Sequence, residues 1–330
     1  DLAEAHNNLG NALRDLGKLD DALASHQKAL DIRPDYAEAH FNVGNLFQEL
    51  GKLDDAANGY RRALAIKPDF VKAHNNLGTT LQGVGKPEDA AASYRRALNL
   101  KPDFAEAHHN LGIALRDLGK LEEAIASYQK AIALKSDFAD AHNNLGVTLR
   151  ELGKRELAVA DLTRAINRGL RSAEAYFERG QLQEQLDEPP AALDDYSSAI
   201  HIAPESRFDK ARAELYETLG AYSDAAIDWG SVIERDAADI ASRLKRGEIY
   251  LLLDKHDSAL KDFRAVLTLD PINVRAIRGC GSAETGRGNH DKAVELLTKA
   301  IRVDARYVEA YGSRGDAFQA LGQHSEAVQD

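Results

Sequence analysis

The chain of 330 residues has no methionine, a single cysteine and no long apolar run. One thiol, Cys280, cannot form a disulfide within the chain, which excludes a disulfide-stapled fold and favours a reducing compartment such as the cytoplasm. A membrane span needs about 20 consecutive apolar residues, so we expect a soluble chain without membrane insertion. Because it lacks an initiator methionine and stops at Asp330 inside the pattern described below, we interpret it as a stretch of a longer protein.

Positive charge is not in surplus in either half of the chain. Residues 1–172 carry 23 Lys and Arg against 24 Asp and Glu, and residues 173–330 carry 19 against 29, a net charge of −10. No basic stripe appears, so nucleic acid is not an expected partner. The acidic second half favours a cationic partner. Dissolved salt screens this electrostatic attraction and weakens it.

A unit of 34 residues recurs along the chain. The motif Ala-His-x-Asn-Leu/Val-Gly begins at Ala5 and returns every 34 residues up to Ala141. Counted from Ala3, small residues recur at repeat position 8 (Gly or Ala), position 20 (Ala) and position 27 (Ala or Val). This register requires a sixth repeat that is one residue short, and the later repeats are more degenerate than the first five.

Each repeat predicts two helices. Apolar or aromatic residues have helical spacing at positions 4, 7, 11 and 14, which in the first repeat are His6, Leu9, Leu13 and Leu16. Glycine at position 15 predicts the end of the first helix, and acidic pairs predict the start of the second. Position 24 supplies a bulky anchor for the second helix. Proline at position 32 ends that helix, and the aspartate that often follows is a candidate cap for the next helix.

Small residues at positions 8, 20 and 27 with proline at 32 resemble the tetratricopeptide repeat family. The resemblance covers nine complete repeats and a tenth cut within its second helix. A single hairpin buries too little surface to stand alone, so the repeats must stack. The family resemblance implies an all-α, right-handed α-solenoid with a concave groove lined by the first helices. We expect one solenoid over residues 1–330, with a sub-array 3–172 of five regular repeats and an acidic sub-array 173–330 of four degenerate repeats plus the truncated tenth.

A column of asparagines occupies the first helices of sub-array 3–172, at positions that line the concave surface in the family. The column stands at position 6, with further asparagines at positions 5 and 9: Asn8, Asn42, Asn76, Asn110, Asn144, Asn7, Asn75, Asn143, Asn11 and Asn45. An amide both donates and accepts hydrogen bonds, so such a column is able to grip an extended peptide backbone. Position 6 becomes Glu178 in the sixth repeat, so the column ends near Asn144. The alternative interpretation is that these asparagines are merely solvated.

The column is similar to the asparagine ladder in the repeat array of O-GlcNAc transferases, through the AHNNLG, LGK and KPDF segments of residues 3–172. The carboxylate clamp of co-chaperone members needs basic residues that are missing here, because Asn7 and Asn11 are followed by Asn76. A receptor for chaperone tails is therefore disfavoured. In the second sub-array arginine precedes the position-8 glycine at Arg179, Arg246 and Arg314, and we predict that these arginines pair with acids inside their hairpins.

No catalytic or metal-binding constellation emerges from the sequence. Histidines recur at position 4, one per repeat, and residues on successive hairpins do not converge on one ion. We interpret them as packing residues, and Cys280, at inward position 7, as a buried structural thiol. The segment GCGSAETGRG lacks the strand and the spacing of a phosphate loop, and its extra glycines, Gly279 and Gly286, are expected to weaken their helix. We predict no enzyme activity, no metal and no cofactor.

The prediction is a non-catalytic protein-interaction scaffold that binds an extended partner segment in its groove. The alternative is the substrate-recognition arm of a larger enzyme, such as an O-GlcNAc-transferase-like glycosyltransferase, whose catalytic domain is outside this chain. Sequence beyond Asp330 discriminates between the two. Self-association through uncovered helix faces at the ends of the array is a third prediction.

Overall fold

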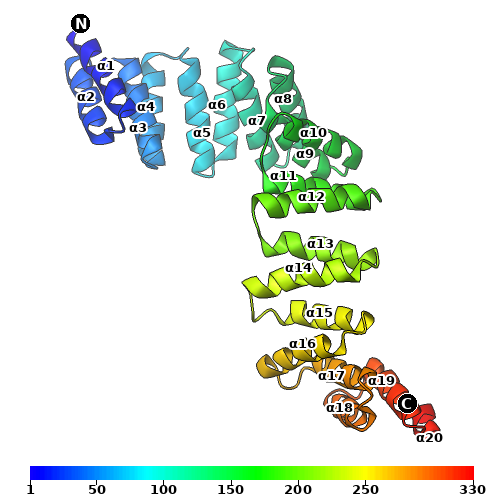
Figure 1. Cartoon of the computed structure of the whole chain (residues 1–330). Helices are drawn as coiled ribbons and strands as arrows, with labels where there is room; N and C mark the ends of the chain where they lie inside the picture. Colours follow the sequence, from blue (N-terminus) through cyan, green and yellow to red (C-terminus); the bar gives the residue numbers. More distant parts are fainter. The chain divides into compact units, whose positions relative to one another are not determined.

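The computed structural model describes all 330 residues, and its regular elements are twenty α-helices with no strand, as predicted (Figure 1). The helices form two compact units, Asp1–Arg171 and Ser172–Asp330, which are described separately below. Whether the chain forms one continuous solenoid stays a prediction.

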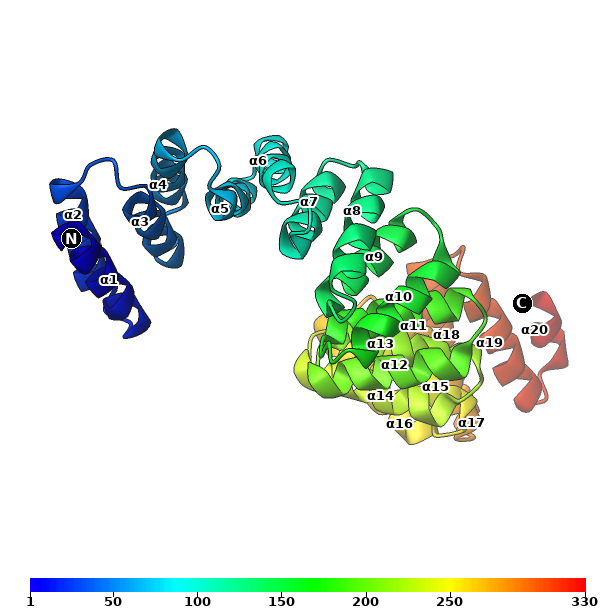
Figure 2. The ribbon, with the colours of Figure 1, turned by 90° about the horizontal axis from the view of Figure 1, so that it is seen from above.

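The first unit contains five helix pairs, one for each regular repeat, and Figure 2 shows the pairs following one another along the chain. Their bounds are α1 Leu2–Asp15, α2 Leu19–Ile32, α3 Ala37–Glu49, α4 Leu53–Ile66, α5 Val71–Gly83, α6 Pro87–Leu100, α7 Ala105–Asp117, α8 Leu121–Leu134, α9 Ala139–Glu151 and α10 Arg155–Asn167.

The second unit contains the remaining five pairs. Their bounds are α11 Ala173–Gln185, α12 Pro189–Ile202, α13 Ser206–Thr218, α14 Tyr222–Arg235, α15 Ile240–Leu252, α16 His256–Leu269, α17 Val274–Gly286, α18 His290–Val303, α19 Val308–Ala320 and α20 His324–Gln329. We call the first helix of each pair helix A and the second helix B.

Glycine at position 15 ends helix A because it adopts a left-handed backbone. Gly17, the first of these glycines, has φ of 74° and donates its N–H to Arg14 O at 2.8 Å, while Lys18 N–H reaches Leu13 O at 2.9 Å. These two bonds satisfy carbonyls that the helix leaves unpaired at its end. In the second unit Asp187 and Asp254 take the same left-handed conformation in place of glycine.

The aspartates after proline do not cap the next helix, so that prediction is wrong. In repeats two to four the cap position is held by an aromatic residue, Tyr36, Phe70 or Phe104, which makes no side-chain cap bond. The aspartate lies one residue earlier in the chain, from where its carboxylate makes no bond to the first turn. Side-chain caps occur instead at Ser172, Asp239 and Asn273 in the second unit.

The small residues hold the two helices of each pair together. The position-20 alanines of repeats one to nine and all the position-27 residues are at most 1% exposed. A Cβ added at Gly78 would lie 2.6 Å from the ring of Tyr94, the position-24 anchor of the same repeat. Helix A therefore presents bare backbone to an aromatic ring of helix B, as the sequence predicted.

Two apolar positions in the first repeat are exposed where burial was expected. Leu9 and Leu16 are 49% and 72% exposed. In later repeats position 7 packs against helix B of the preceding repeat, as Val43 does against Leu30. Position 14 is also exposed in repeats two and seven, at Leu50 and Leu219, so only the exposure of Leu9 is particular to the first repeat.

Candidate partner-binding surface

The predicted asparagine column lies on what we call the A-helix face, the side of the first unit formed by α1, α3, α5, α7 and α9. Helices of this face touch across repeats, since α1 contacts α3, α5 contacts α7 and α7 contacts α9. Side chains one repeat apart are therefore close enough to bond to each other.

The asparagines of successive repeats are joined by hydrogen bonds. Asn42 Nδ2 donates to Asn7 Oδ1 at 2.9 Å, and Asn110 Nδ2 donates to Asn75 Oδ1 at 3.3 Å. In each case a position-6 amide reaches back to the position-5 amide of the preceding repeat. These four asparagines are thus linked in pairs across repeats.

Repeat two has Phe41 at position 5 in place of asparagine. The position-6 asparagine of repeat three therefore bonds to position 9 of repeat two. Asn76 Nδ2 donates to Asn45 Oδ1 at 3.0 Å. The hydroxyl of Tyr60 lies 2.8 Å from both Asn45 Oδ1 and Gln48 Oε1, and burial raises the pKa of Tyr60 to about 12. A groove of about 470 Å³ opens beside this network, lined by Arg14, Asn45, Gln48, Glu49 and Asn76.

The remaining predicted residues are less connected. Asn144 donates its Nδ2 group to the ring of His109 at 2.8 Å. Asn143 has a buried Oδ1 without a partner, Asn8 is exposed, and Asn11 is half-buried. The linked part of the surface therefore extends from Asn7 to Asn144.

Two histidines belong to this network although the sequence analysis did not select them. His109 occupies position 5 of repeat four, and burial lowers its pKa, so it meets Asn144 as a neutral ring. His26 Nδ1 lies 3.0 Å from Asn7 Oδ1, which already accepts from Asn42. His26 must therefore donate from Nδ1, and its buried Nε2 is left without a partner. The only sequence signal for His109 was its place in the column.

Three of the position-4 histidines contact the backbone, whereas His142 Nδ1 lies 3.0 Å from Asp161 Oδ1. His40, His74 and His108 each place Nε2 2.9 Å from the carbonyl of the proline six residues earlier. No group of three or more His, Cys, Asp or Glu side chains in the structure is arranged to hold a metal ion. Cys280 is buried, and burial raises its pKa to about 11, which makes it a poor nucleophile.

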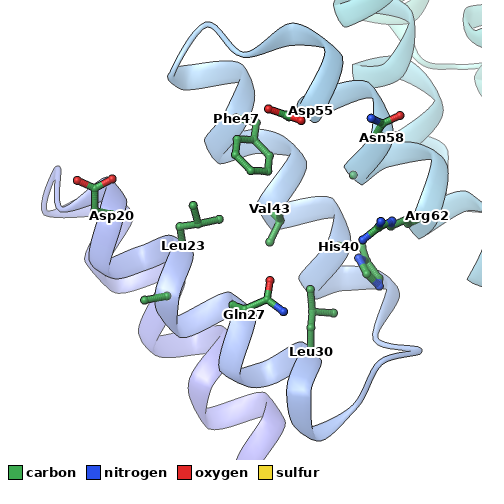
Figure 3. Close-up of a pocket in the computed structure, with 12 residues that line it drawn as sticks. Asp20, Leu23, Gln27, Leu30, His40, Val43, Phe47, Asp55, Asn58 and Arg62 are labelled. Carbon is green, nitrogen blue, oxygen red and sulfur yellow. The ribbon is translucent and has the colours of Figure 1, made fainter.

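A second groove of the first unit lies between the B helices of repeats one and two, α2 and α4 (Figure 3). Its volume is about 570 Å³, and α3 contributes the apolar side chains of Val43 and Phe47. Asp20, Asp55 and Arg62 are on its rim. None of the predicted asparagines lines this groove.

In the second unit the arginines pair inside their hairpins, as predicted. Arg179, Arg246 and Arg314 each hold both oxygens of the aspartate sixteen residues later, and Arg212 does the same. A groove of about 350 Å³ lies on α11 and α13 of this acidic unit. The exposed side chains of Glu184 and Glu214 line it. A cationic partner for it stays a prediction.

The repeat sequence and the paired helices define a tetratricopeptide repeat protein. Family profiles described as "TPR repeat" match residues 10–51, 44–85, 83–115 and 114–153. Profiles described as "Tetratricopeptide repeat" match residues 143–207, 240–273 and 281–330. Together they cover well over half of the chain, which therefore belongs to the tetratricopeptide repeat family. Members of this family bind proteins or peptides, which supports a protein-interaction scaffold.

Solved structures of the same fold include other repeat proteins. The C-terminal part of a TPR repeat-containing protein from Cytophaga hutchinsonii is 18% identical with a TM-score of 0.61, covering 72% of this chain and 98% of its own. Pseudomonas aeruginosa PilF is 21% identical (TM-score 0.58, 64% and 97% covered), and PilW, a type IV pilus biogenesis factor, is 23% identical (TM-score 0.57, 63% and 96%). Comparison with curated protein sequences finds no match.

None of the twenty helices combines the length and apolar character that a membrane crossing requires.

Proposed function

We propose that the chain is a non-catalytic scaffold whose A-helix face, in the first unit, binds an extended segment of a partner protein. The observation that carries this proposal is the linkage of the asparagine amides from repeat to repeat. Asn42 and Asn144 each use Nδ2 as a donor within the protein, while their Oδ1 atoms accept no bond. These two amides are therefore held in fixed orientations with an acceptor still available to a ligand.

Fixed orientation matters because binding then costs little side-chain entropy. Immobilising a flexible side chain costs about 0.5–1.5 kcal/mol, which is as much as one hydrogen bond contributes. Packed helices lie about 8–10 Å apart and an extended chain advances about 3.3–3.6 Å per residue, so one amide meets about every third residue. A backbone bound in this way is recognised largely independently of its side chains.

The test uses peptides selected from a random displayed library by the intact chain. The affinity of a selected peptide is measured for the native chain and for a triple variant, Asn42→Ala, Asn110→Ala and Asn144→Ala. Three lost bonds of about 1 kcal/mol each predict a loss of affinity on the order of 100-fold. Circular dichroism establishes that both proteins are equally folded.

A matched control removes three exposed asparagines of B helices, Asn58, Asn99 and Asn167. This control is expected to bind like the native chain. Equal binding by the column variant would reject the proposal and direct attention to the B-helix groove of Figure 3.

The rival proposal, a recognition arm of a larger glycosyltransferase, uses the same A-helix face. It is supported by the similarity of the asparagine column to that of O-GlcNAc transferases. Glycosyltransferase activity in the gene product that contains this chain, lost in the column variant for protein substrates, would favour it.

A further inference from the structure

The B-helix groove between α2 and α4 (Figure 3) exposes apolar side chains at positions that later repeats bury. Val43 and Phe47 of α3, at repeat positions 7 and 11, line the groove, and both are only half-buried. The leucines at the same two positions of repeats three to five are at most 8% exposed: Leu77, Leu81, Leu111, Leu115, Leu145 and Leu149. Repeat two therefore presents apolar surface to solvent where the following repeats do not.

Small residues keep this groove open. Ala24 of α2 and Gly59 of α4 line it at positions 22 and 23 of their repeats. A Cβ added at Gly59 would lie 2.9 Å from Gly44 Cα, so at this point α4 lies against α3 with no side chain between them. Leu23 and Leu30 of α2 add apolar surface. The volume of about 570 Å³ lies within the range of about 300–1,000 Å³ that is typical of ligand sites.

Charged side chains lie at both ends of the B-helix groove. Asp20 and Asp55 belong to the first turns of α2 and α4, and Arg62 lies about two turns further along α4 (Figure 3). None of these three side chains makes a hydrogen bond or an ion pair within the protein. A related groove of about 680 Å³ between α6 and α8 is lined by Arg95 and Lys130 but by no acid. The B-helix groove therefore has an acidic end and a basic end, whose charges are available to a ligand.

The groove offers few hydrogen-bonding groups to an extended peptide. Its walls are helices whose backbone groups bond internally, and the amides of Gln27 and Asn58 already bond to Asp31 and Arg61. An extended chain would leave many of its N–H and C=O groups without a partner, whereas a helix satisfies its own. Figure 3 shows that α2 and α4 run in the same direction. Two such helices with apolar residues between them are able to pack a third helix.

We propose that the B-helix groove binds an amphipathic α-helix of a partner protein, antiparallel to α2 and α4. The bound helix carries a basic residue that meets Asp20 and Asp55, and about two turns before it an acidic residue that meets Arg62. Its C-terminal end, with a partial negative charge, then lies beside the N-termini of α2 and α4. Its apolar residues, at helical spacing, cover Val43 and Phe47. None of the residues of the asparagine column lines this groove, so the two proposals fail independently.

The probes are peptides of alanine and glutamine, labelled with fluorescein and held helical by a hydrocarbon staple on the outward face. Glutamate at position i and lysine at i+7 match the separation of Arg62 and Asp55. Leucine, isoleucine, phenylalanine or methionine varies at i−4, i+3 and i+4, which share one face with the charged residues. Fluorescence anisotropy with the full chain measures the affinity. We expect saturable binding, and binding about three- to tenfold weaker when glutamine replaces both charged residues of the peptide.

Variants of the protein test the space and the charge of the groove separately. Ala24→Trp fills the groove from an exposed position of α2 and is expected to weaken binding about tenfold or more. The matched control Ala65→Trp makes the same change at an exposed position of α4 outside the groove and should leave binding unchanged. Arg62→Glu is expected to weaken binding about three- to tenfold, and a peptide with lysine in place of its glutamate should recover the loss.

Circular dichroism establishes that the native and variant chains are equally folded. Absence of binding by every peptide of the set, or equal binding by Ala24→Trp and the native chain, would overturn the proposal. Equal binding of charged and uncharged peptides, with no effect of Arg62→Glu, would overturn the assigned orientation and charge pattern. Self-association that Ala24→Trp abolishes, measured by sedimentation velocity, would show that a second copy of the chain occupies the groove and would overturn its assignment to a partner protein.

Discussion

His26 stands at position 24 of the first repeat, where the next three repeats carry tyrosine. Burial, and to a lesser extent the positive charge of Arg14, lowers the pKa of His26 from 6.5 to about 4. The unfolded chain therefore binds a proton that the native state excludes. Stability contributed by neutral His26 is complete above about pH 6.5 and is lost as the pH falls towards 4.

We predict that the first repeat loses about 2 kcal/mol of stability between pH 7.5 and pH 5, from the proton linkage of this one group. Hydrogen exchange of α1 and α2 at the two pH values measures the loss. The variant His26→Tyr, which restores the residue of the next repeats, should remove most of the difference. If exchange in native and variant chains depends on pH equally, His26 is not the titrating group.

Gly279 and Gly286 of α17 are explained by their neighbours, not by flexibility. A Cβ at Gly279 would lie 2.4 Å from the buried ring of Phe263, and one at Gly286 would lie 2.3 Å from His256. Both rings belong to helix B of the preceding repeat. The two glycines let repeats eight and nine approach, although each still has the entropic cost of glycine in a helix.

Gly279→Ala is predicted to destabilise the chain by about 1–3 kcal/mol, because Phe263 has no room to move. Gly312→Ala provides the matched control, since α19 has nothing within 4 Å of a Cβ at that position. This control should stabilise its helix by about 0.5–1 kcal/mol. Urea denaturation compares the two, and a neutral Gly279→Ala would contradict the packing argument.

At the scale of the helices, positions 7 and 23, one on helix A and one on helix B, carry two different kinds of residue pair. At positions 7 and 23 repeat three carries Leu77 and Ser93, whereas repeat eight carries Arg246 and Asp262, which bond to each other. Asp262 is only 1% exposed. A buried pair of this kind adds little net stability, but removing Arg246 leaves the Asp262 carboxylate without its hydrogen-bonded cation, because Arg243 Nη1 lies 3.8 Å from Oδ1.

Arg246→Leu is therefore expected to cost about 3 kcal/mol of unfolding free energy. Adding Asp262→Ser gives repeat eight the same pair as repeat three and is expected to recover all but about 1 kcal/mol. Urea unfolding of the native chain, the single variant and the double variant forms the comparison. A double variant as unstable as the single one would show that the charge left by Asp262 is not the cause.

At the scale of the whole molecule, contacts join helices that are neighbours or next neighbours in sequence. Stability in such arrays is close to a sum over repeats and their interfaces. We predict that residues 1–171 and residues 172–330 fold when expressed separately, and that their circular dichroism spectra add to that of the intact chain. The first fragment should retain the peptide of the asparagine column.

Loss of helix content in either fragment would show that the two units depend on each other for folding. In that case the intact chain, and not its parts, is the unit for both binding tests.

The amino-acid sequence by itself determined the repeat, the helix pairs, the glycine ends of the A helices and the close contact of small residues with aromatic rings. These features depend on residues within one repeat or the next, whose spacing the helix period sets. The pairing of Arg179 with Asp195 was predictable for the same reason. The expectation for Leu16 was wrong because periodicity predicts an apolar stripe but not what covers it.

Only the tertiary structure decided how the binding side chains are used. The hydrogen bond between Asn42 and Asn7 joins α3 to α1, although the two residues are 35 positions apart in sequence. It depends on the rotamers and the separation of both side chains. The same holds for Glu248, whose oxygens accept hydrogen bonds from Arg275, while Arg278 Nη2 lies 3.6 Å from Oε1. Sequence periodicity specifies which residues share a face. Whether two side chains on that face form a hydrogen bond depends on a few tenths of an ångström, which only the packing of neighbouring repeats determines.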